Sequence, residues 1–84
     1  MRMSHGFSQN REREWTERAA RHIKAELKRA DLTYEDLAVR LKKHGSKESR
    51  ASIANKLARA TMPAAFFLAC LAAMGLEGVA LEEI

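Results

Sequence analysis

The chain has 84 residues, which suffices for one small domain. It carries 15 Lys and Arg against 11 Asp and Glu, a formal net charge of +4, and 46% of its residues are hydrophobic. The single cysteine, Cys70, excludes an intramolecular disulfide, and its apolar neighbours predict a buried thiol, so a reducing cytoplasm fits best. The N-terminus lacks the apolar stretch of a secretory signal, and we expect no export.

The charges are sharply segregated along the sequence. All 15 basic residues lie before position 60, whereas residues 60–84 contain three acidic residues and no basic one. Residues 40–59 hold seven basic residues against one acidic residue, Glu48. Clustered cations favour a polyanionic partner, because neutralising phosphates releases bound counterions. The sequence therefore predicts a nucleic-acid partner for this segment.

Residues 1–10 are polar and without an apolar period, and we predict a flexible N-terminal arm. A first helix follows, with Ser8 or Asn10 as its cap, and ends near Ala30. We expect Trp15 to pack against the fourth helix, since it lies on the apolar stripe of the first. That stripe consists of Trp15, Ala19, Ile23, Leu27 and Ala30.

The second helix is predicted over residues 34–42. Thr33 precedes it and offers a hydroxyl cap, and acidic residues occupy its first turn. Its inward residues recur at helical spacing, and Gly45 is free to adopt the positive φ that closes a helix. They are Tyr34, Leu37, Ala38 and Leu41.

The third helix is predicted over residues 49–59, capped by Ser46 or Ser49. Its buried side is formed by Ile53, Ala54, Leu57 and Ala58, and Arg50 lies in the first turn and bends outward. At 100° per residue, the opposite side faces solvent or a ligand. That side contains Ser52, Asn55, Lys56 and Arg59.

The fourth helix is predicted over residues 64–74, with Thr61 as cap and Pro63 at its start, and Gly75 ends it. Almost every side chain is apolar, which is typical of a central helix or of one shared with a second copy of the chain. We expect its large residues to form the core first and a homodimer surface second. A short last turn then closes the core. The apolar run is short and interrupted, so we expect no membrane span.

Short pieces of a known pattern occur in order over residues 20–84. They are Leu32-Thr33, Asp36-Leu37-Ala38, Leu41, Ser52-Ile53-Ala54-Asn55-Lys56-Leu57, Pro63, Leu71-Ala72-Ala73-Met74-Gly75-Leu76 and Leu81-Glu82-Glu83-Ile84. In this order they resemble the lambda-repressor and Cro class of helix-turn-helix proteins. The resemblance implies an all-α bundle of four to five helices over residues 11–84, here with an extended turn between helices two and three.

A second pattern resembles a bacterial family of small proteins described only as a domain of unknown function, which implies a fold and no activity. It is carried by Trp15, Leu27-Lys28, Thr33-Tyr34, Leu37-Ala38, Ile53-Ala54-Asn55-Lys56, Arg59, Phe66-Phe67 and Gly75.

We therefore expect a cytoplasmic, sequence-specific DNA-binding protein, a transcriptional regulator that inserts its third helix into the major groove. Asn55 suits adenine, Arg50 or Arg59 suits guanine, and Ser52 suits either strand. The residues expected to hold the phosphates are Lys42, Lys43, Lys47 and Lys56. The alternative is a protein-interaction module, an antitoxin or adaptor, whose basic face binds an acidic protein.

Catalysis is poorly supported by the sequence. His5, His22 and His44 are scattered over an arm, a helix and a turn, with no helical pair and no cysteine companion. This spacing predicts neither a zinc site nor a nucleophile with its base. We expect no enzyme, no cofactor, no metal and no small-molecule substrate.

Overall fold

Four α-helices and a short C-terminal 3₁₀ turn form the computed structural model, which describes the backbone of residues 3–84 and the side chains of residues 13–84. The elements are α1 (Met3–Ala30), α2 (Tyr34–Lys43), α3 (Arg50–Arg59), α4 (Ala64–Ala73) and η1 (Leu81–Glu83). No strand occurs within residues 3–84. The predicted all-α fold class is confirmed, and α2, α3 and α4 fall where the periodicity placed them.

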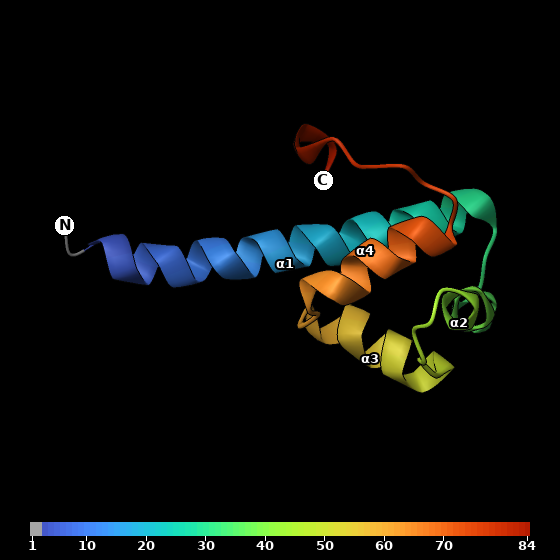
Figure 1. Ribbon diagram of the computed structural model, residues 1–84. Helices are drawn as coiled ribbons and strands as arrows, with labels where there is room; N and C mark the ends of the chain where they lie inside the picture. The colour runs from blue at the N-terminus through green and yellow to red at the C-terminus, as the bar shows by residue number, and fades with distance from the viewer. Residues whose placement is uncertain (1–2) are drawn as a thin grey trace.

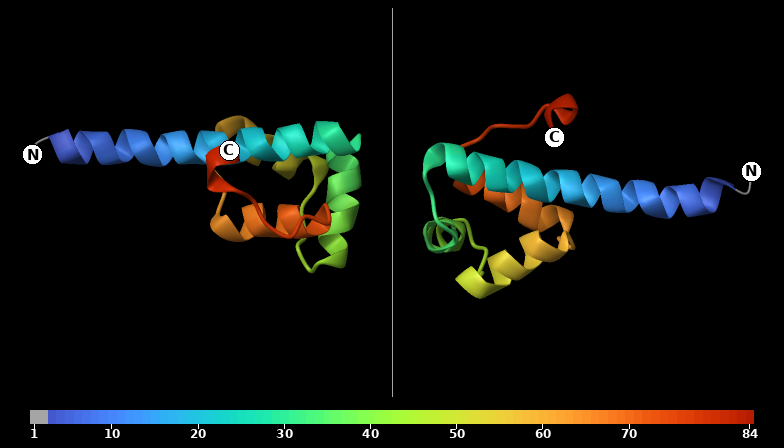
Figure 2. Two further views of the ribbon diagram at one scale, coloured as in Figure 1. Left: turned by 90° about the horizontal axis from the view of Figure 1, so that it is seen from above. Right: turned by 180° about the vertical axis from the view of Figure 1, so that it is seen from behind.

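Helices α1 and α2 each pack against both α3 and α4. In Figure 1, α2 is seen end-on while α3 runs across the view, so the two helices cross steeply, and Figure 2 shows the same crossing from behind. The arrangement leaves one side of α3 uncovered.

The core is built from the apolar stripes of all four helices. Ile23, Leu37, Leu41 and Ile53 are fully buried, and none of the described polar or charged side chains is buried with them. Such a core stabilises through loss of apolar surface to water, at about 25 cal/mol per Å². The complete set of buried residues is Ala20, Ile23, Leu27, Leu37, Leu41, Ile53, Leu57, Phe66, Cys70, Leu71 and Ala73.

Helix α1 begins at Met3, well before the predicted start after Asn10. Residues 3–10 are therefore helical, and the cap predicted at Ser8 or Asn10 is wrong. That residues 1–10 form a flexible arm stays a prediction, and Met1 and Arg2 lie outside the described residues. Adding residues to an existing helix is easy, because each contributes a hydrogen bond once the first turn exists. Figure 1 shows this part of α1 projecting beyond the other helices, so it needs no apolar stripe.

Trp15 does not pack against α4 as predicted, since 45% of its surface is exposed. The buried positions of α1 are Ala20, Ile23 and Leu27, and Trp15 lies on the flank of that stripe. There the guanidinium carbon of Arg18 lies 4.5 Å from the centroid of the Trp15 ring, a cation–π contact.

Short-range signals set the ends of α2. The Thr33 hydroxyl accepts from the Asp36 amide at 3.0 Å, and the Asp36 carboxylate accepts from the Thr33 amide at 2.9 Å. The hydrogen bond from the Thr33 amide to the carboxylate, together with the Thr33 side chain, lowers the pKa of Asp36 below its ordinary value. At the other end Gly45 has a φ of +81°, and the Ser46 amide donates to the Leu41 carbonyl at 2.9 Å. The predicted cap and stop of α2 are both confirmed.

Helix α4 begins differently from the prediction. Pro63, not Thr61, is its N-cap residue, and the Pro63 carbonyl accepts from the amides of Phe66 and Phe67. Thr61 lies two residues upstream, so it does not cap the helix. Gly75 ends α4 with a φ of +77°, as predicted.

The C-terminal segment returns along α1 (Figure 2). The Arg18 Nε donates to the Ile84 carbonyl at 2.8 Å, and Val79 and Ile84 are half-buried. Within the described residues, no helix combines the length and apolar character needed to cross a bilayer.

Candidate nucleic-acid interface

Residues 44–49 connect α2 to α3, a longer link than the usual three- or four-residue turn of a helix-turn-helix. The link ends in a capping box. The Ser49 hydroxyl accepts from the Ser52 amide, and the Ser49 amide donates to the Ser52 hydroxyl, both at 3.0 Å. Of the two predicted caps, Ser49 is the one used, and it fixes the first turn of α3.

Glu48 folds back along one flank of α3. Its carboxylate accepts from the Ser52 hydroxyl at 2.6 Å and from the Lys56 ammonium at 2.6 Å. The same ammonium lies 4.8 Å from the centroid of the Phe66 ring. Only 11% of the Glu48 side chain and 30% of the Lys56 side chain are exposed. We call Glu48, Ser52 and Lys56 the Glu48 cluster.

The contacts within the Glu48 cluster also lower the pKa of the Glu48 carboxyl. Burial alone would raise the pKa of the Glu48 carboxyl, but the hydrogen bonds from Lys56 and Ser52 and the charge of Lys56 outweigh it. The pKa therefore lies below its ordinary value, and Glu48 is ionised at neutral pH. Its charge is compensated inside the protein.

The expected exposed ridge of Ser52, Asn55, Lys56 and Arg59 is wrong for two of its members. Ser52 and Lys56 are half-buried and engaged by Glu48, whereas Asn55 and Arg59 are exposed. The prediction from helical spacing assumed that α3 is covered on one side only. In the structure, the link of residues 44–49 covers a second side of the helix. The open face of α3 consists of Ala51, Asn55, Ala58 and Arg59, so the prediction that Ala58 lies on the buried side is wrong.

The remaining predicted contact residues are all exposed. Arg50 is the first residue of α3 and points outward from its first turn, as expected. A hollow of about 400 Å³ is lined by Lys42, Lys47 and Ser49 and also by Glu48. Lys42 and Lys47 thus lie beside the start of α3, and Lys43, the last residue of α2, is exposed as well.

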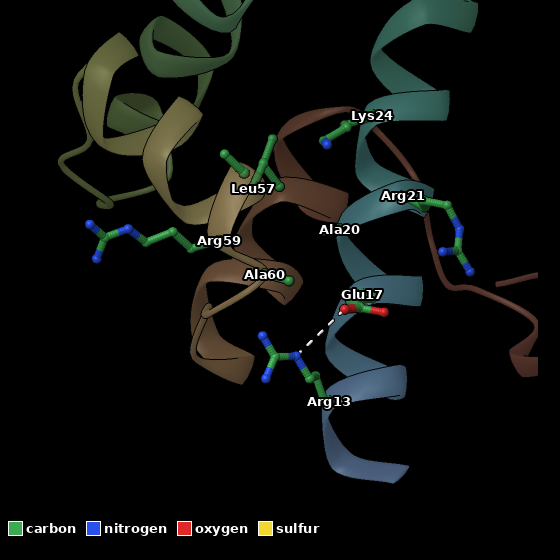
Figure 3. Close-up of a pocket in the computed structure, with 9 residues that line it drawn as sticks. Arg13, Glu17, Ala20, Arg21, Lys24, Leu57, Arg59 and Ala60 are labelled. Atoms are coloured by element: carbon green, nitrogen blue, oxygen red, sulfur yellow. Dashed lines mark ion pairs between the residues drawn. The ribbon is translucent and has the colours of Figure 1, made fainter. Parts of the chain in front are cut away.

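A groove between α1 and the end of α3 was not predicted (Figure 3). It has a volume of about 510 Å³ and is open to solvent. From α1 come Arg13, Glu17, Ala20, Arg21 and Lys24, and from the end of α3 come Leu57, Ala58, Arg59 and Ala60. Helical spacing places the α1 residues on one side, but nothing in the sequence indicates that α3 ends beside them.

The histidines with described side chains do not form a metal site. His22 lies 3.7 Å from the Glu26 carboxylate, and His44 Nδ1 lies 3.1 Å from the Arg40 carbonyl. His5 lies outside the described side chains. Among those that are described, no three His, Cys, Asp or Glu residues gather closely enough to hold a metal ion.

Part of the surface of α4 that was predicted to form a homodimer contact is buried in the core of the protein itself. Phe66 is buried, and Phe67 and Met74 are half-buried against the same cluster of apolar residues. Leu68 is 61% exposed. A homodimer through this helix stays a prediction, with Leu68 as the large side chain available for it.

Comparison with known proteins places the chain in a family. Residues 15–79 match the model of a family described as Domain of unknown function (DUF6471). Neither a curated protein nor a solved structure matches the chain. The match spans all of α2, α3 and α4 and the packed part of α1. The chain therefore belongs to the family called Domain of unknown function (DUF6471).

Proposed function

We propose that this protein binds double-stranded DNA through α3 and regulates transcription as a helix-turn-helix protein. The observation that carries the proposal is the sign of the exposed charge over residues 40–59. The only carboxylate of that segment, Glu48, faces inward and is paired with Lys56. Every exposed charge there is positive: Arg40, Lys42, Lys43, Lys47, Arg50 and Arg59. Such a surface attracts phosphates through counterion release.

The open face of α3 has the shape and chemistry for reading bases. Ala51 and Ala58 are small, so the helix backbone can approach the floor of a major groove. Between them Asn55 presents an amide that matches adenine, and Arg50 and Arg59 present guanidinium groups that match guanine. Ser52 and Lys56 no longer belong to the proposed contact set, because the Glu48 cluster engages both.

The start of α3 supports a phosphate contact. Lys42 and Lys47 line the hollow beside Ser49, and the N-terminus of α3 carries a partial positive charge. Such contacts fix the register of a helix on the duplex without reading its sequence. A homodimer would place two copies of α3 on paired half-sites.

Arg50→Glu tests the contact face. Arg50 is exposed at the first turn, where an acidic residue suits the helix dipole, so the variant should fold and melt like the wild type. We expect it to lose binding to a fluorescent random duplex in anisotropy titrations at low salt. The control is Arg29→Glu, with the same change of charge on α1. Equal affinity of wild type and Arg50→Glu would remove α3 from the interface.

DNA binding by the wild-type protein tests the proposed function directly. Its binding should weaken as salt rises, with a log–log slope of about −0.9 per neutralised phosphate. After selection of a preferred sequence, Asn55→Ala should reduce discrimination at one base pair by about 1–3 kcal/mol. No binding to duplex DNA at low salt would refute the proposal and favour the interaction module with an acidic protein partner.

A further inference from the structure

The groove between α1 and the end of α3 carries a surplus of positive charge. Arg13 pairs with Glu17 at 3.7 Å, so these two charges largely compensate each other. Arg21, Lys24 and Arg59 make no ion pair or hydrogen bond with any other described residue. Three cations therefore line the groove without a partner among residues 13–84, beside one compensated pair.

The cationic side chains differ in how they lie relative to the groove. In Figure 3, Arg13 and Lys24 extend from α1 toward the side of α3, whereas the side chains of Arg21 and Arg59 extend away from the groove on its two opposite sides. Small residues, Ala20, Ala58 and Ala60, line the groove between the cations. Because these side chains are small, an extended polymer strand can come close to both helices. The groove is open to solvent, so it does not enclose a compact ligand.

The groove continues the open face of α3. Ala58 and Arg59 belong to both surfaces, because they are exposed on α3 and also line the groove. A duplex on Asn55 and Arg59 would therefore have a backbone strand close to Lys24. We propose that the groove between α1 and α3 binds the phosphate backbone of the same DNA duplex. This inference rests on the proposed function and adds α1 to its interface.

Two substitutions test the inference in opposite directions. Lys24→Gln removes an unpaired cation and should weaken binding to random duplex by roughly eightfold at 0.1 M salt, the counterion-release factor for one phosphate. The log–log salt slope should become shallower by about 0.9. Glu17→Gln frees Arg13 for a phosphate, so affinity should rise and the slope should steepen by about the same amount.

Each substitution has a matched control on the same helix. Glu14→Gln also removes a carboxylate that pairs with an arginine four residues on, with Arg18 at 3.8 Å, but Glu14 does not line the groove. Lys28→Gln removes an exposed cation outside the groove whose side chain, like that of Lys24, has no ion pair or hydrogen bond with another described residue. We expect both controls to leave the salt slope unchanged, and all four variants to melt close to the wild type.

The outcomes separate the two proposals. If the wild type binds duplex but Lys24→Gln behaves like Lys28→Gln and Glu17→Gln like Glu14→Gln, the groove proposal is overturned and α3 remains the interface. If the wild type binds no duplex, the proposed function itself fails. Opposite shifts for Lys24→Gln and Glu17→Gln, without shifts in the controls, support the groove.

Discussion

Glu48→Ala should destabilise the protein far more than removal of an ordinary surface carboxylate. The Glu48 carboxylate accepts two hydrogen bonds at 2.6 Å, from Ser52 and from the charged Lys56. A hydrogen bond to a charged group contributes about 1.5–3 kcal/mol when shielded from water. Since 30% of the Lys56 side chain is exposed, screening reduces this sum, and we expect a loss of about 2 kcal/mol.

Thermal unfolding followed by circular dichroism measures the effect. For a domain of this size, about 2 kcal/mol corresponds to a decrease in Tm of roughly 10 °C. Glu82→Ala is the control, because Glu82 is an exposed carboxylate in the C-terminal turn. Its Tm should stay within about 2 °C of the wild type, as expected for a surface substitution.

The pH dependence gives an independent check. The folded protein lowers the pKa of Glu48, so the carboxylate stabilises the fold above the ordinary glutamate pKa of about 4.3. This contribution is lost as the pH falls through the lower, folded pKa. The Tm difference between wild type and Glu48→Ala should therefore be full at pH 7 and shrink in acid. A Tm change no larger than that of Glu82→Ala, or a difference that persists at low pH, would refute the reasoning.

Three further predictions follow from single residues. Ala60 has a φ of +53°, so Ala60→Gly should relieve backbone strain. After the entropy cost of glycine is subtracted, the free energy of unfolding should rise by about 0.5–1 kcal/mol in a thermal melt, and a lower Tm would contradict this. Burial, together with the charge of Glu48, raises the pKa of the Cys70 thiol to about 12. A thiol reagent at pH 8 should therefore react with Cys70 only as the protein unfolds, and fast labelling of the native protein would disprove this. If the homodimer uses α4, Leu68→Lys should lower the mass measured by sedimentation, whereas an unchanged dimer mass would place the contact elsewhere.

Local sequence signals were sufficient for much of the fold. Thr33, Ser49, Gly45 and Gly75 set helix ends through hydrogen bonds and backbone angles that span a few residues. The apolar stripes of α2 and α3 likewise depend on spacing within one helix. The ends of α1 at Ala30 and of α3 at Arg59 were also predicted, but the positive φ that Asp31 and Ala60 adopt beyond these ends, without being glycine, was not.

The sequence by itself determined that the protein is helical, where three of its helices lie, and that residues 40–59 are strongly basic, because propensity, spacing and charge are properties of neighbouring residues. Only the tertiary structure decided which cations remain available. It turned Lys56 toward Glu48, left Trp15 on the surface, and brought Lys24 of α1 to the groove at the end of α3. Each of these outcomes depends on how one segment folds onto another, and a pattern read along a single helix contains no information about that direction.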